Sequence, residues 1–227
     1  VAVSVKRATA DIPIVFVVGT DPVKAGFVES FAKPGGRLTG IHMLGMDLTA
    51  KRLEILKEIL PKLRRVVTFY NPKNSAARES AMLGREAAKR LGIEFVERQV
   101  ASVEELRAAL KALKAGEVGA FFQVSDAMIT SQAQSIIEAA RAIRLPTMFF
   151  ERGIVAQGAL ASYGVNLHDG GRQSAKHVQR ILAGTNPKDL PVESVDRLEL
   201  VLNLRTAQEL GLTIPRQIRL RADTTIE

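Results

Sequence analysis

The sequence has no cysteine and no tryptophan, only two tyrosines, and no long apolar run. The lack of cysteine excludes thiol catalysis, cysteine-ligated zinc and disulfide bonds. The longest apolar run covers residues 14–18 and is far too short to form a membrane-spanning helix. Val1 opens into a mixed sequence that already contains Ser4, Lys6 and Arg7, so no signal peptide is recognised. Because the chain does not open with methionine, we expect a targeting segment to have preceded Val1.

Basic residues outnumber acidic ones, 32 to 24, which gives a net charge of +8. The sequence has no run of five like charges, and aromatic residues do not alternate with the lysines and arginines. A nucleic-acid-binding face usually concentrates such residues. We therefore interpret the excess charge as a solvated, mildly basic surface and expect no nucleic-acid partner.

The order of elements predicts the fold class. Short apolar runs rich in Val, Ile and Phe predict strands at residues 12–18, 38–44, 65–70, 93–100, 120–124, 147–150, 160–163 and 198–203. Helical patterns separate them, at residues 23–31, 49–61, 74–91 or 75–91, 102–114, 126–143, 169–184 and from residue 206. Strands that alternate with such helices indicate parallel βαβ units, and strands apolar on both faces indicate a sheet covered on each side. The prediction is a doubly wound α/β protein with two sheets, divided near residues 47–61.

Ligands of open α/β sheets bind beyond the carboxyl ends of the strands. The candidate ligand-binding residues at these ends are Thr20, Asp21, Asn71, Asn74, Ser75, Ser125, Asp126, Glu151 and Tyr163. Their hydroxyls, amides and carboxylates suit a small polar molecule. Structural alternatives stay open for several of them. Ser75 and Asp126 are also good helix N-caps, as is Thr49, and Asp21 precedes a proline in a common turn pair.

Catalytic and metal-binding patterns are missing. The three histidines have no metal-ligand spacing, and no G-x-S-x-G motif marks a nucleophile. Gly170-Gly171 lies near a helix start, but no phosphate-binding motif surrounds it. We therefore expect a binding protein that is not an enzyme, has no cofactor and no metal, and returns its ligand unchanged.

Four stretches, at residues 12–41, 51–77, 157–192 and 198–215, together resemble one family. They include IPIVFVVGTDPVKAGF, VVTFYNPKNSAA, QGALASYGVNLHDGGRQSAKHV and LELVLNLRTAQELGLTIP. The family is the substrate-binding component of ABC importers of the tryptophan/tyrosine-binding type. The resemblance implies a type I periplasmic binding protein fold, in which two Rossmann-like lobes clamp the ligand. It divides the chain into a first-lobe remnant (1–48), a second lobe (49–168), and a crossover helix with a C-terminal segment returning to the first lobe (169–227).

Family members begin with two further βα units and another strand, so we expect about 60 or more residues of the first lobe to be absent. The resemblance implies a periplasmic or other extracytoplasmic protein, lipid-anchored through the missing N-terminus. Its partners would be an ABC permease and a small ligand, such as an aromatic amino acid. The incomplete first lobe would leave residues 12–18 as an exposed edge strand, which predicts self-association. Two alternatives remain: the ligand-sensing domain of a transcription regulator, and a Rossmann-like enzyme, which lacks support from any nucleophile or metal cluster.

Overall fold

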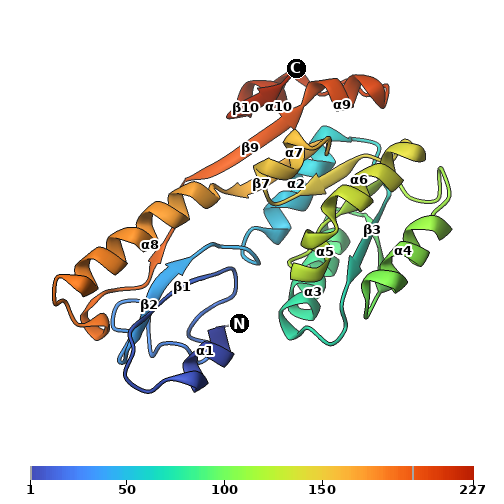
Figure 1. Ribbon diagram of the computed structural model, residues 1–227. Helices are drawn as coiled ribbons and strands as arrows, with labels where there is room; N and C mark the ends of the chain where they lie inside the picture. The colour runs from blue at the N-terminus through green and yellow to red at the C-terminus, as the bar shows by residue number, and fades with distance from the viewer. Residues whose placement is uncertain (1, 196) are drawn as a thin grey trace. The chain divides into compact units, whose positions relative to one another are not determined.

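The computed structural model describes residues 2–195 and 197–227 (Figure 1). The chain forms two compact units, each with its own sheet. Unit 1 consists of Val1–Gly45 and Val165–Leu198, and unit 2 of Met46–Gly164 and Glu199–Glu227. The two sheets are those that the alternation of strands and helices predicts. None of the described helices is both long and apolar enough to cross a membrane.

Unit 1 contains a three-stranded sheet in the order β1-β2-β8, in which β2 pairs in parallel with both β1 and β8. Its elements are α1 (Ala2–Ala8), β1 (Ile14–Val18), β2 (Leu38–His42), α8 (Leu167–Leu182), the 3-10 helix η1 (Pro187–Asp189) and β8 (Glu193–Ser194). Phe16 and Phe27 are central to a buried cluster on this sheet. Gly40 lets β1 and β2 approach closely, because a Cβ there would lie 2.0 Å from the carbonyl oxygen of Phe16.

Unit 2 contains a seven-stranded sheet in the order β10-β9-β7-β6-β5-β3-β4. The strands are β3 (Arg65–Tyr70), β4 (Glu94–Gln99), β5 (Ala120–Phe122), β6 (Thr147–Phe149), β7 (Ala161–Val165), β9 (Leu198–Asn203) and β10 (Thr224–Ile226). The neighbours from β4 to β7 pair in parallel. Their amino ends therefore share one edge of the sheet, and their carboxyl ends share the other.

Helices cover both faces of this sheet (Figure 1). The helices of unit 2 are α2 (Thr49–Ile59), α3 (Ser75–Arg90), α4 (Val103–Ala112), α5 (Ala127–Ser131), α6 (Ala133–Ala142), α7 (Arg152–Ala156), α9 (Leu204–Glu209) and α10 (Arg216–Arg221). One core cluster joins α2, α3, α9 and α10 to alternate residues of β3, such as Val66. A second cluster joins α4, α5, α6 and α7 to the intervening residues, such as Val67. This two-sided burial is the doubly wound arrangement that the apolar strands predict.

The structure corrects several local predictions. Residues 23–31 form turns rather than a helix, and Gly26 there adopts a left-handed conformation (φ 68°), which interrupts a helix. Helix α8 begins at Leu167, because the side chain of Asn166, and not Asp169, caps it. Thr49 is the first residue of α2 and makes no cap hydrogen bond. Of the two residues predicted to open α3, Asn74 is the cap and Ser75 is the first helical residue.

The C-terminal segment also differs from the prediction. Residues 199–227 belong to unit 2, although the predicted division returned this segment to the first lobe. The physical reason is burial: Leu200, Leu202 and Ile218 lie in the same core cluster as α2 and α3. The segment predicted as a polar tail contains α10 and β10, and β10 pairs in parallel with β9.

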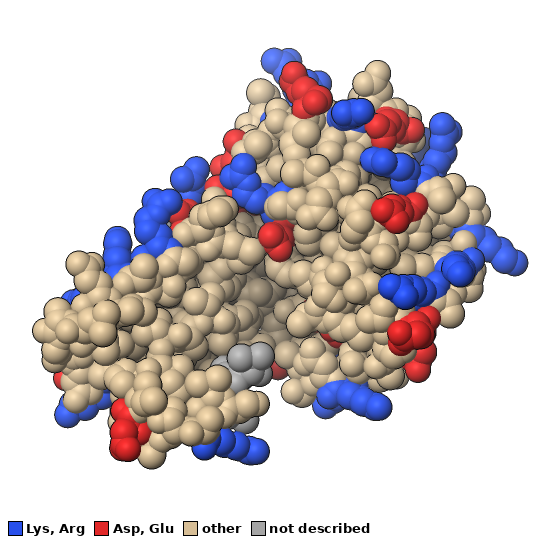
Figure 2. All heavy atoms as spheres, viewed as in Figure 1, with Lys and Arg blue, Asp and Glu red and all other residues tan. Residues whose placement is uncertain are grey.

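Charged side chains are dispersed over the surface. On the face shown in Figure 2, Lys and Arg side chains are spread widely, with Asp and Glu side chains between them. This distribution on the visible face agrees with the interpretation of a solvated, mildly basic surface.

Candidate functional site

The candidate site is the carboxyl edge of the seven-stranded sheet. Seven of the nine candidate residues belong to unit 2, in the loops or strand ends at this edge: Asn71, Asn74, Ser75, Ser125, Asp126, Glu151 and Tyr163. The strand order β7-β6-β5-β3 places β7 next to the ends that lead to Glu151, Asp126 and Asn71. Tyr163 lies in the middle of β7, which continues to Val165 rather than ending at residue 163 as predicted. The other two candidates, Thr20 and Asp21, follow β1 in unit 1. The sheet order therefore groups the unit 2 candidates at a single edge.

Asp126 has a structural role at this edge. Its side chain is 3% exposed and caps α5, accepting hydrogen bonds from the backbone N–H groups of Met128 (2.9 Å) and Ile129 (3.4 Å). Its other carboxylate oxygen accepts a hydrogen bond from the backbone N–H of Asn71 (2.7 Å) and ties the β3 and β5 loops together. Three backbone donors thus satisfy the carboxylate, which supports the cap interpretation.

Asp21 and Asn74 also serve the backbone. Asp21 Oδ1 accepts hydrogen bonds from the N–H groups of Val23 (2.8 Å) and Lys24 (3.1 Å). Asn74 Oδ1 accepts hydrogen bonds from Ala76 and Ala77 and caps α3. Ser75 is exposed at the first position of that helix. Asn74 thus satisfies two of the backbone N–H groups at the start of α3, and the exposed Ser75 is the residue there that a ligand can reach.

Ser125 lies at the middle of the edge and is half-buried. Its backbone N–H donates to Ser80 Oγ (2.9 Å), and Ser80 is completely buried on α3. Ser80 Oγ also lies 3.5 Å from Thr49 Oγ1 on α2. This chain of hydroxyls fixes the Ser125 loop against both helices on that face of the sheet.

Glu151 differs from the two aspartates. It occupies the N-cap position of α7, yet its side chain makes no cap hydrogen bond. The side chain is half-buried, and one carboxylate oxygen lies close to Gly153. Of the three candidate carboxylates, only Glu151 is not used to satisfy backbone N–H groups at a turn or helix start.

Arg52 is a residue of this edge that the predictions missed. It projects from α2, is 1% exposed, and donates from Nε to the backbone oxygen of Tyr163 (2.9 Å). Its guanidinium carbon lies 5.9 Å from the centre of the Phe150 ring. Burial lowers the pKa of Arg52 from 12.5 to about 10, while its interaction with Tyr163 acts in the opposite direction. Arg52 therefore stays charged at neutral pH and places a positive charge beside the ends of β6 and β7.

Tyr70, by contrast, is committed to a side-chain cluster with β4. Its hydroxyl lies 3.0 Å from the carboxylate of Glu97 and accepts a hydrogen bond from Gln99 (3.1 Å). Arg85 forms a two-point ion pair with Glu97. Burial raises the pKa of Glu97, but the hydrogen bonds from Arg85 and Tyr70 outweigh it and the pKa falls below 4.5. The pKa of Tyr70 is raised, mainly by burial and to a smaller extent by the hydrogen bond to Glu97.

Among the described residues, no group of three or more His, Cys, Asp or Glu side chains is arranged to hold a metal ion. The carboxyl edge thus offers one carboxylate, one buried cation, hydroxyls, a helix start and two aromatic rings. This set of groups can hold a small molecule that carries both charges and a ring.

A comparison with protein families decides the classification. The family model described as "ABC transporter substrate binding protein" matches residues 1–226. The chain belongs to this family. Its members are solute-binding proteins, not enzymes. The fold is that of type I periplasmic binding proteins, with mostly parallel sheets in an α/β arrangement.

Individual relatives agree with this family. A tyrosine-binding protein of Clostridioides difficile (strain R20291) is 30% identical over 207 residues, which cover 91% of this chain and 59% of the relative. A crystal structure of a conserved domain protein from Vibrio cholerae has a TM-score of 0.89 and 32% identity, over 99% of this chain and 75% of that one. The crystal structure of an ABC domain from Streptococcus pneumonia in complex with L-Trp has a TM-score of 0.85 and 26% identity, over 99% and 77%. The chain thus spans less than two thirds of the tyrosine-binding relative.

Proposed function

We propose that this chain binds an aromatic amino acid at the carboxyl edge of the unit 2 sheet. We further propose that it belongs to an extracytoplasmic protein that delivers this ligand to the permease of an ABC importer. Family membership supports the solute-binding role, and the relatives described as tyrosine-binding and L-Trp-bound support the ligand class. A contribution from Thr20 and Asp21 of unit 1 remains a prediction from their place after a strand, and a clamp formed by both lobes remains a prediction of the resemblance.

The ligand's carboxylate is assigned to the start of α3. This helix has 16 residues and no acidic residue in its first turn, so its N-terminal dipole is not neutralised there. Because Asn74 already accepts from the N–H groups of Ala76 and Ala77, the attraction for a carboxylate comes from the helix dipole and from the residues beside the helix start. Ser75 and Asn71 flank this position and add a hydroxyl and an amide. The buried charge of Arg52 increases the preference of the same edge for an anion.

The ligand's ammonium group is assigned to Glu151. A half-buried carboxylate that makes no cap hydrogen bond is the observation that carries this proposal. A charge-assisted hydrogen bond to an ammonium is stronger than a neutral one. The aromatic rings of Tyr163, in the middle of β7, and Phe150, which follows β6, provide the surface for the ligand's ring.

The test compares two acidic residues at the same edge. Glu151→Gln should weaken binding of L-tyrosine and L-tryptophan by about 10- to 100-fold, since a hydrogen bond to a charged group contributes about 1.5–3 kcal/mol. The Glu151→Gln variant should unfold at the same midpoint urea concentration as the parent. Asp126→Asn should instead lower the free energy of unfolding by about 1 kcal/mol, because an amide has one acceptor oxygen and cannot accept from both Asn71 and the start of α5. Calorimetric titration and urea unfolding measure the two effects.

Two results would contradict the proposal. One is full affinity for both amino acids in Glu151→Gln. The other is a screen in which a sugar or nucleoside raises the melting temperature of the protein and no amino acid does. The regulator alternative has weaker support, because the similarity to a ribose operon repressor, at 14% identity, concerns the fold alone. A helix-turn-helix encoded upstream of Val1 would favour it, and a signal peptide would favour the importer.

A further inference from the structure

A cavity lies at the opposite, amino edge of the unit 2 sheet. It has a volume of about 800 Å³ and lies where β3, β5 and β6 begin. Its lining comes from four segments: residues 59–65, residues 116–119, Arg144 with Pro146, and residues 211–213. This volume is within the usual range for small-molecule pockets, about 300–1,000 Å³. We call it the amino-edge cavity.

The amino-edge cavity is separate from the candidate amino-acid site. Both are built on β3, but at opposite ends of the strand, which has six residues. At about 3.3 Å per residue, the two ends lie about 20 Å apart. A ligand in one site therefore makes no contact with a ligand in the other.

The lining combines an apolar interior with unbalanced positive charge. Leu60, Pro61, Val118, Pro146 and Leu212 supply apolar surface. The only acidic residue among the lining side chains is Glu117, and other residues already neutralise it.

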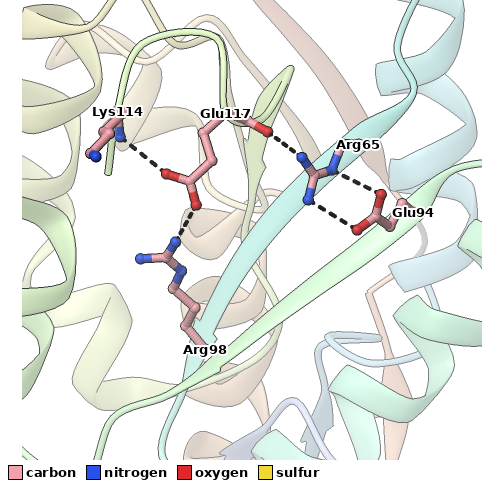
Figure 3. Close-up of polar contacts among 5 residues, drawn as sticks. All are labelled: Arg65, Glu94, Arg98, Lys114 and Glu117. Carbon is pink, nitrogen blue, oxygen red and sulfur yellow. Dashed lines mark hydrogen bonds and ion pairs between the residues drawn. The ribbon is translucent and has the colours of Figure 1, made fainter. Parts of the chain in front are cut away.

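Figure 3 shows how the acidic groups near this cavity are used. The carboxylate of Glu117 accepts hydrogen bonds from Arg98 and from the backbone N–H of Lys114 (3.2 Å). Arg65 pairs with Glu94 (2.8 Å) and donates to the backbone oxygen of Glu117 (2.9 Å). Both carboxylates of this network are thus occupied by Arg65 and Arg98. Neither carboxylate is therefore available to neutralise the remaining cations of the cavity.

Those remaining cations are Lys62, Arg64 and Arg144. Among the described residues, none of the three forms an ion pair with an acidic side chain. Lys62 and Arg64 lie in the loop between α2 and β3, and Arg144 lies between α6 and β6. Two separate loops therefore contribute positive charges to the lining of the amino-edge cavity.

The backbone of Arg144 supplies an independent observation. Five helices, α3, α6, α7, α8 and α9, are followed two residues later by a residue with positive φ. Four of these residues are glycines: Gly92, Gly158, Gly184 and Gly211. After α6 the residue is Arg144, with φ 54°. Glycine is the usual residue at this position, and a side chain held in the left-handed region is strained, which often marks a functional site.

We propose that the amino-edge cavity binds a free anionic amphiphile, a molecule with a carboxylate or phosphate head and an apolar body. The head lies among Lys62, Arg64 and Arg144, and the body lies against the apolar lining. A purely polar anion would leave that lining in water, and a cation would be repelled. The proposal for this cavity does not rest on the proposed amino-acid site, because the two sites lie at opposite edges of the sheet.

The experiment titrates the purified protein with sodium laurate, at monomeric concentrations, in a calorimeter. Arg144→Gly and Arg64→Gln should each weaken laurate binding about fivefold, which corresponds to about 1 kcal/mol, the interaction of two unit charges 4 Å apart in water. Arg90→Gln, an exposed arginine at the end of α3, is the matched control and should leave binding unchanged. Dodecyl maltoside and inorganic phosphate, which carry only the chain or only the charge, should bind at least tenfold more weakly than laurate.

Arg144→Gly also separates a binding role from a structural one. Because glycine adopts the left-handed conformation without strain, this variant should unfold at the same or a higher urea concentration than the parent. A loss of laurate affinity without a loss of stability supports the proposal. Unchanged laurate affinity in Arg144→Gly, equal binding of phosphate, or binding only to vesicles of anionic phospholipid would overturn it.

Discussion

Replacing Arg52 should separate the stability of the fold from ligand binding. Arg52→Met keeps an unbranched apolar side chain of similar length and removes the guanidinium. The change has two opposing effects on the free energy of unfolding. It removes the hydrogen bond from Nε to the oxygen of Tyr163, and a hydrogen bond from a charged donor contributes about 1.5–3 kcal/mol. It also removes the desolvation cost of a buried charge.

The size of that cost follows from the pKa. Burial lowers the pKa of Arg52 from 12.5 to about 10. At about 1.4 kcal/mol per unit, this shift corresponds to roughly 3 kcal/mol. The cost is present at every pH below about 10, where Arg52 is charged in both the folded and the unfolded chain. Because the two effects are similar in size and opposite in sign, Arg52→Met should change the free energy of unfolding by less than about 2 kcal/mol.

Ligand binding should respond more strongly. Without Arg52, the end of β7 and the Phe150 ring lose a contact that holds them before the ligand arrives. Ordering one side chain on binding costs about 0.5–1.5 kcal/mol, so we expect the affinity for L-tyrosine to fall about tenfold. Arg52→Lys keeps the charge and should lose less. Urea unfolding and calorimetric titration measure both quantities, and full affinity in Arg52→Met would refute the reasoning.

Two further predictions concern other parts of the chain. Because the folded-state pKa of Glu97 lies below 4.5, its contribution to stability should be present above that pH and be lost as the pH falls through the folded value. Glu97→Gln should therefore flatten the acid side of the pH profile of the urea midpoint, while the exposed Glu138→Gln should not. Self-association is expected at β1, whose only described strand partner is β2 and whose Val17 is 49% exposed. Light scattering at tens of micromolar should show a dimer or larger species that Val17→Lys abolishes, and a monomeric parent chain would contradict this.

The fold class was predictable because burial on two faces leaves a simple pattern in the sequence. The strands β3 and β9 begin and end where the apolar runs predict. Short elements were harder to predict. Strand β8 has two residues and both are exposed, so its sequence carries no apolar signal. Its place depends on parallel pairing with Ile41 and His42 of β2, a contact distant in the chain.

The roles of the acidic residues were partly predictable. A capping carboxylate must reach the N–H groups two and three residues ahead, and the short side chain of aspartate does so. Asp126 spans that distance in the structure. Glu151 has one methylene more and makes no such bond at the same helix position. The difference between Asp and Glu at a strand end was thus a usable signal for which carboxylate is available to a ligand.

Arg52 and Arg144 could not be found by examining the ends of strands, because neither residue lies at one. Arg52 lies beside Leu53 on the buried side of α2, and a charged residue within an apolar stripe is a signal that a survey of loops does not reach. Arg144 follows a helix at a position where glycine follows four others. Both are departures from a local rule, an apolar face in one case and a glycine stop in the other. Such departures carry a cost in stability, and for this reason we assign both side chains a proposed role in ligand binding.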